Sequence, residues 1–183
     1  MTTWSGRPAL NFASFLTAEF FKAILDQLDV VSSPAATLSA DHGGVTSSTT
    51  FVSTNLKRPA VASQAYHFRA HLYYSASTAG DFKPGLSLPS GSTLHRYALR
   101  SLPSSTDSAS GDTYYGTDTT FGTLTAPGQT TASTIIHCVM EGDFTTGVTA
   151  GDVTVQYAQA SSNATATILR ARSTLHLQPT EVL

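Results

Sequence analysis

The chain has 183 residues and a formal net charge of −2, and only 12% of its residues are charged. This length suits one domain with a hydrophobic core, and the low charge with 9% aromatic residues argues against intrinsic disorder. Cys138 is the single cysteine, which excludes an intrachain disulfide framework, and the chain lacks the basic block of a nucleic-acid binder and the long apolar run of a membrane span.

Residues 1–31 have the apolar spacing of an amphipathic helix, with large side chains every three or four positions. Thr17 is a suitable N-cap and Pro34 stops the pattern, so we expect a helix over about residues 17–30. A single helix of this length is marginal alone, so either the protein's own β domain or a neighbouring subunit must cover its apolar face. We interpret it as an anchoring and assembly arm, and its apolar residues are Phe12, Phe15, Leu16, Phe20, Ile24 and Leu28.

Residues 32–50 are mostly small and polar and include Gly43-Gly44, so they predict a flexible linker. Residues 51–183 carry the signals of strands, and their spacing predicts a mainly β fold with one β-sandwich domain of the jelly-roll kind. The clearest strand is 66–74, where apolar and polar residues alternate. Shorter candidates are 86–88, 93–99, 134–140, 153–159, 164–170 and 173–177.

Residues 101–119 are rich in Ser, Thr, Asp and Gly and predict a long exposed loop. Tyr114 and Tyr115 lie in this segment between glycines. Exposed aromatic side chains in a polar loop suit glycan or protein recognition. Alternatively, both tyrosines fold back onto the sandwich or onto a neighbour.

Two groups of residues have the chemical types of a metal or catalytic site. His67, Arg69 and His71 share one strand face, but the two histidines are about 13 Å apart, which is too far for one metal ion. We expect these three residues to form a polar outer face of the sheet. The alternative is a metal ion shared across the axis of a trimer. His137 and Cys138 are adjacent on a strand and point to opposite faces, so we expect a buried, structural Cys138.

The chain contains no phosphate-binding loop, no nucleophile elbow and no convincing pair of carboxylates for glycan hydrolysis. We therefore predict a protein that is not an enzyme, with no catalytic residues, no cofactor and no metal ion. The start of the chain lacks the basic and apolar stretches of a signal peptide, so we expect it to be used without export.

The last third of the chain carries a series of short motifs. Gly142 is followed by 151–153 (GDV), 155–159 (VQYAQ), 164–167 (ATAT) and 173–177 (STLHL). Upstream lie 66–68 (YHF), 81–83 (DFK) and 89–93 (PSGST), and the N-terminus has Trp4, Gly6, 16–20 (LTAEF) and 25–28 (LDQL). Together these motifs resemble small structural proteins of tailed actinobacteriophages, which serve as minor tail or head decoration proteins.

The resemblance implies a TNF/C1q-like trimeric jelly-roll domain in a structural protein of the virion, assembled in the host cytoplasm. The implied partners are further copies of the chain and other capsid or tail proteins, with no nucleic acid and no membrane. Tail-associated and capsid-decorating placements are both compatible, with a slight preference for the tail. The alternative is a receptor- or glycan-binding module that uses the 101–120 loop on a host-surface glycan.

Overall fold

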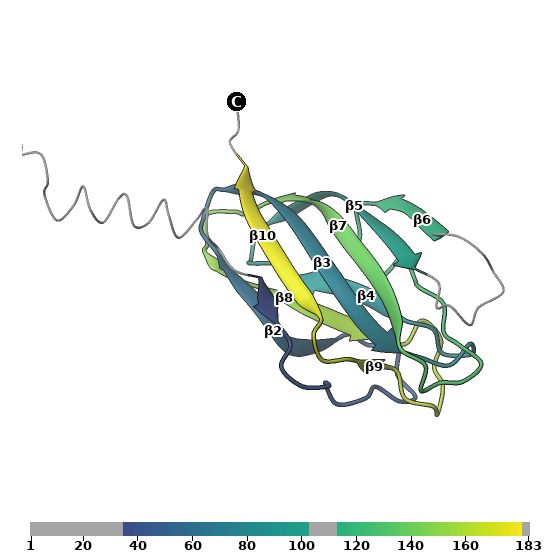
Figure 1. Cartoon of the computed structure of the whole chain (residues 1–183). Helices are drawn as coiled ribbons and strands as arrows, with labels where there is room; N and C mark the ends of the chain where they lie inside the picture. Colours follow the sequence, from purple (N-terminus) through teal and green to yellow (C-terminus); the bar gives the residue numbers. More distant parts are fainter. Residues whose placement is uncertain (1–34, 103–112, 181–183) are drawn as a thin grey trace, which may run out of the picture. The chain divides into compact units, whose positions relative to one another are not determined.

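A computed structural model describes residues 35–102 and 113–180 of the chain (Figure 1). This part is mainly β, and its strands form two antiparallel sheets. The described residues contain no helix long and apolar enough to cross a membrane. The predicted helix at 17–30 and its apolar residues Phe12, Phe15, Leu16, Phe20, Ile24 and Leu28 lie outside the described residues.

The larger sheet has the strand order β1-β10-β3-β7-β5-β6, with β9 paired to β3. Figure 1 shows β10, β3 and β7 side by side, with the strands of the smaller sheet, in the order β2-β8-β4, behind them. The larger sheet contains β1 (Ala36–Thr37), β3 (Ala65–Ser75), β5 (Thr93–Leu102), β6 (Thr113–Asp118), β7 (Ile136–Thr145), β9 (Ile168–Leu169) and β10 (Thr174–Thr180). The smaller sheet contains β2 (Val52–Ala60), β4 (Lys83–Ser87) and β8 (Gly151–Ala158).

One hydrophobic core joins the two sheets. Alternate residues of β3 are buried, including Phe68, Leu72 and Tyr74, because successive side chains of a strand point to opposite faces. Tyr74 stacks on Phe82 with ring centroids 4.2 Å apart, and Phe82 contacts Tyr157 of the smaller sheet at 5.9 Å. Full burial of a large apolar side chain stabilises the fold by about 1.5–3 kcal/mol. The shared core is compatible with a β-sandwich.

The structure confirms the predicted strand at 66–74 as the inner part of β3, and it also contains strands at 86–87, 93–99, 136–140, 153–158 and 174–177. The candidate at 164–170 is reduced to the two residues of β9. The predicted loop at 101–119 is wrong in part, because residues 113–118 form β6 and pair with β5.

The domain begins earlier than the predicted boundary at residue 51. Within the segment expected as a linker, β1 pairs with β10, and Leu38 and Val45 are buried in the core. Val45 also exchanges backbone hydrogen bonds with Thr167. The linker prediction rested on the small and polar composition of residues 32–50. It overlooked Leu38 and Val45, the two apolar residues that attach this segment to the core.

Candidate functional site

The larger sheet has one face that points away from the core, and this face carries four of the six histidines of the chain. On β3 the outward residues alternate with the buried ones. The cross-strand register places residues of β7 and β10 beside them. We call this surface the outer face; its residues are His67, Arg69, His71 and Tyr73 of β3, His137, Val139, Glu141 and Asp143 of β7, and His176 of β10.

The centre of the outer face is a pair of histidines on neighbouring strands. His71 Nδ1 lies 3.2 Å from His137 Nε2, and the two ring planes are nearly parallel, with centroids 5.3 Å apart. One ring donates its N–H to the bare nitrogen of the other, which requires that at least one ring is neutral. Tyr73 stacks on the His137 ring at 4.7 Å, and His176 approaches His71 edge-on at 6.5 Å.

Both rings of the pair are held in the neutral state near pH 7. Partial burial, followed by the charge of Arg69, lowers the pKa of His71 below its ordinary value of 6.5. Partial burial, followed by the charge of His71, lowers the pKa of His137. Burial has this direction for histidine because it disfavours the charged form.

Two arginines on or beside the outer face lie close to a carboxylate, and His67 forms a hydrogen bond with another. Arg69 Nε is 3.7 Å from Glu141 Oε2, and Arg100 Nη2 of β5 is 4.0 Å from Glu141 Oε1. His67 Nδ1 is 2.8 Å from Asp143 Oδ1. These side chains are 30–53% exposed, so solvent screens the pairs and each one contributes little to stability. Their arrangement nevertheless leaves few charges without a neighbour of opposite sign.

An apolar patch lies beside the histidine pair. Val139 points outward but is only 6% exposed, and His71 and Arg100 lie opposite it on the two neighbouring strands. Ile135, just before β7, is 56% exposed. Ile135 and Tyr73 line an open groove of about 420 Å³ together with Asp41 and residues 170–172. The outer face therefore combines neutral, aromatic and apolar groups in a form that can be buried against another surface.

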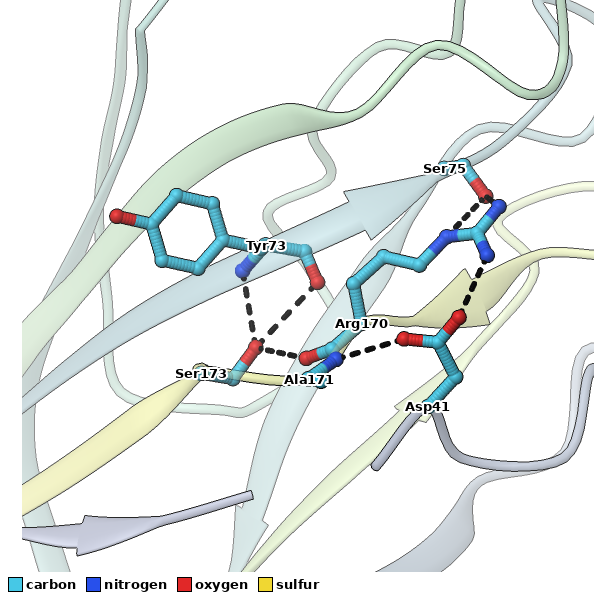
Figure 2. Close-up of polar contacts among 6 residues, drawn as sticks. All are labelled: Asp41, Tyr73, Ser75, Arg170, Ala171 and Ser173. Atoms are coloured by element: carbon cyan, nitrogen blue, oxygen red, sulfur yellow. Dashed lines mark hydrogen bonds and ion pairs between the residues drawn. The ribbon is translucent and has the colours of Figure 1, made fainter. Parts of the chain in front are cut away.

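A polar cluster at one end of the sheet holds the border of this groove (Figure 2). Arg170 donates to Ser75 Oγ from Nε at 3.1 Å and from Nη2 at 2.7 Å, and its Nη1 contacts Asp41 Oδ2 at 2.7 Å. Asp41 Oδ1 accepts the N–H of Ala171 at 2.8 Å. The Tyr73 ring points away from the Arg170 guanidinium in this view, so the two groups do not converge on one ligand position.

Ser173 extends the same cluster into β3. Its Oγ accepts the N–H of Tyr73 at 3.0 Å and donates to the carbonyl of Arg170 at 2.8 Å. The polar atoms of Arg170, Asp41 and Ser173 form hydrogen bonds with one another, with Ser75 and with the backbone. We therefore interpret the cluster as structural. It fixes the position of Tyr73 at the edge of the outer face.

Among residues 35–102 and 113–180, no group of three or more His, Cys, Asp or Glu side chains has the arrangement of a metal site. Cys138 is fully buried, and burial raises the pKa of its thiol. Its neighbour His137 points to the other side of the sheet, as the alternation of a strand predicts. Cys138 and His137 therefore do not form a nucleophile–base pair.

The predicted recognition residues Tyr114 and Tyr115 lie in β6, at the edge of the larger sheet. Tyr114 is the register partner of Arg100, so its backbone belongs to the sheet and not to a loop. Their side chains are not among the described parts of the chain, and they stay predictions. The same holds for the apolar residues of the helical arm.

The sequence reasoning missed the association of His71 with His137 and His176. The signal was present in part, since His137 interrupts the apolar segment at 134–140, whereas His176 takes a polar position in the alternating segment at 173–177. Which strands are neighbours cannot be read from such local patterns, because the two members of the pair are 66 residues apart.

No protein-family model matches this chain, and neither a curated protein nor a solved structure matches it.

Proposed function

We propose that this chain is a structural protein of a tailed-phage virion, assembled as a homotrimer through its β domain. In this proposal the N-terminal helical arm anchors the trimer to the particle, either at the tail as a minor tail protein or on the capsid as a decoration protein. The resemblance of the motifs at 142–177 to actinobacteriophage proteins supports the virion role.

The strand connections support a jelly roll of the TNF/C1q kind. The first five strands alternate between the sheets, with β1, β3 and β5 in the larger and β2 and β4 in the smaller. The last long strand, β10, lies between β1 and β3, and β8 lies between β2 and β4. This pairing of late strands between early ones is typical of a chain wrapped as two Greek keys.

The outer face is the observation that carries the proposal of self-association. Burial of an unpaired charge is costly, whereas this face presents neutral histidines, a tyrosine, apolar groups and charges that already have neighbours of opposite sign. Such a surface can be covered by another copy of the chain at a lower desolvation cost than a surface whose charges have no neighbour of opposite sign. It also carries a tyrosine and an arginine, which are residue types enriched in protein interfaces.

Gold labelling of intact particles with an antibody to this chain, viewed by electron microscopy, tests the proposed role. Label over the head would identify a decoration protein, and label confined to the tail would identify a minor tail protein. Absence of label from particles whose denatured proteins do react with the antibody would mean an inaccessible epitope. Absence of reaction in denatured particles as well would reject the virion role.

A receptor- or glycan-binding module is the second candidate, favoured by the position of Tyr114 and Tyr115 on an edge strand next to residues 103–112. Under this hypothesis Tyr114→Ala with Tyr115→Ala should reduce adsorption of the phage to its host at least tenfold, because aromatic contacts dominate such interfaces. Adsorption assays with particles that incorporate the variant chain provide the measurement. Normal adsorption at normal incorporation would contradict the hypothesis, and Val148→Ala, at an exposed position between β7 and β8, is the control.

A further inference from the structure

The pairing of His71 with His137 has a property that a pair of non-titrating side chains would lack. Each neutral imidazole has one N–H and one bare nitrogen, and the 3.2 Å contact joins a donor on one ring to an acceptor on the other. A first added proton leaves this bond in place, because an imidazolium still donates to a neutral ring. A second added proton removes the acceptor and puts two positive charges side by side.

We propose that His71 and His137 form an acid-sensitive latch between β3 and β7, which is closed while at least one ring is neutral and opens when both rings are charged. The two residues lie diagonally across the antiparallel pair, since His71 faces Val139 and His137 faces Tyr73 in the register. Diagonal neighbours of this kind lie within reach of each other on one face of a sheet. The latch therefore joins two strands at the centre of the larger sheet.

The surroundings of the pair oppose double protonation. Arg69 of β3 and Arg100 of β5 are permanently charged, and His176 of β10 lies edge-on to His71. Glu141 of β7 is the acidic group that faces the cluster, and it is already close to both arginines. With three cationic or titrating neighbours and one carboxylate, a doubly charged pair would be repelled more than it would be stabilised.

Opening of the latch would also change the exposed apolar groups and the charge of the outer face. Val139 is 6% exposed while flanked by the ring of His71, and the ring of Tyr73 stacks on His137. Separation of the rings would uncover both groups and add two positive charges near them. Acidification would thus convert a neutral, partly apolar surface into a cationic one.

Titration of the histidine ring signals of the full chain by NMR tests the latch. In the wild type, His137 should titrate below the ordinary value of 6.5, because burial and then the charge of His71 lower its pKa. His71→Gln keeps a hydrogen-bonding side chain without a charge, so the midpoint of His137 should rise in this variant. His95→Gln changes an exposed histidine bonded to Thr145 Oγ1 and should leave that midpoint unchanged. An unchanged His137 midpoint in His71→Gln would overturn the proposal.

Thermal unfolding gives a second readout with a defined sign. Because the folded-state pKa of both histidines is lowered, the unfolded chain takes up protons first, and stability is lost as the pH falls from 6.5 toward the folded-state values. The Tm of the wild type should therefore fall further between pH 7.5 and pH 5.0 than that of the double variant His71→Gln with His137→Gln. Equal falls would overturn the latch, and if the double variant does not fold, the NMR titration of His71→Gln decides.

A consequence for assembly rests on the proposed function. If the outer face is the subunit contact, the mass of the assembly in solution should fall at pH 5.0 in the wild type and stay constant in the double variant. An equal fall of the mass in the wild type and in the double variant would show that the latch does not control assembly. A monomer at both pH values would instead reject the subunit contact, while the NMR and Tm results would still decide the latch.

Discussion

Arg170 and Asp41 show how a single ion pair can organise three segments of the chain. Arg170 follows β9, Ser75 ends β3, and Asp41 lies in the segment between β1 and β2. The backbone N–H of Ala171 and then the side chain of Arg170 lower the pKa of Asp41. The Arg170 side chain is 20% exposed and that of Asp41 is 48% exposed, so solvent reduces the strength of the pair without removing its geometric effect.

Substitution of Asp41 should cost a small but measurable part of the stability. We expect Asp41→Ala to lower the free energy of unfolding by about 1 kcal/mol, because it removes an ion pair and a hydrogen bond to the backbone. Asp41→Asn keeps an oxygen for the Ala171 N–H and should recover part of the loss. Urea unfolding at pH 7 measures both values.

The same substitution has a pH dependence with a definite direction. Since the folded-state pKa of Asp41 lies below its ordinary value of 3.8, its contribution is complete above that value and is lost as the pH falls through the folded-state pKa. In strong acid the difference between wild type and Asp41→Ala should therefore shrink to about that between Asp41→Asn and Asp41→Ala, because a protonated Asp41 still has an oxygen for the Ala171 N–H. A difference that persists unchanged at low pH would assign the effect to packing.

At the scale of the elements, β7 is the strand around which the larger sheet is built. It pairs with β3 on one side and with β5 on the other, and the register with β5 shifts between Leu94 and Arg96. Gly142 pairs with Tyr97 beside this irregularity, and a Cβ at Gly142 would overlap the carbonyl oxygen of Arg96 and lie 2.8 Å from the Cα of Tyr97. Gly142 lies beyond the end of the predicted strand at 134–140 but inside β7, where glycine allows this close approach of two backbones.

Gly142→Ala should lower the free energy of unfolding by about 2–3 kcal/mol, because the overlap is with backbone atoms that cannot rotate away. Gly43→Ala is the matched control, since no atom lies within 4 Å of a Cβ at that position, and we expect a change within about 0.5 kcal/mol. Denaturant unfolding of both variants measures the difference. Equal stability of the two variants would show that β5 can shift at low cost.

At the scale of the whole molecule, the proposed subunit contact predicts a selective effect of surface charge. Ile135 and Val148 are both large, exposed apolar residues, at 56% and 91%, but only Ile135 lies beside the groove with Tyr73. Ile135→Lys should reduce the assembly to monomers, because it would place a charge in the contact, whereas Val148→Lys should leave it intact. Light scattering with size-exclusion chromatography measures the mass. Trimers in both variants would exclude this end of the outer face from the contact.

The sequence by itself determined the parts that depend on local pattern. Alternation of apolar and polar residues predicted the mainly β fold, the strand at 66–74, and a buried Cys138 with His137 on the opposite side. These predictions hold because the faces of a strand follow from its covalent geometry. β6 and the early start of the domain were missed, because polar strands at a sheet edge and short packed segments have no strong periodic signal.

Only the tertiary structure decided which strands are neighbours and in what register. Residues 71 and 137 become partners because β3 pairs with β7, and Asp41 meets Arg170 because β9 pairs with β3 and the segment after β1 lies against it. Such pairings depend on the packing of the whole core, and no local pattern specifies them, since one shift of register would move every side chain to the opposite face. The outer face and its histidine latch therefore belong to the folded molecule alone.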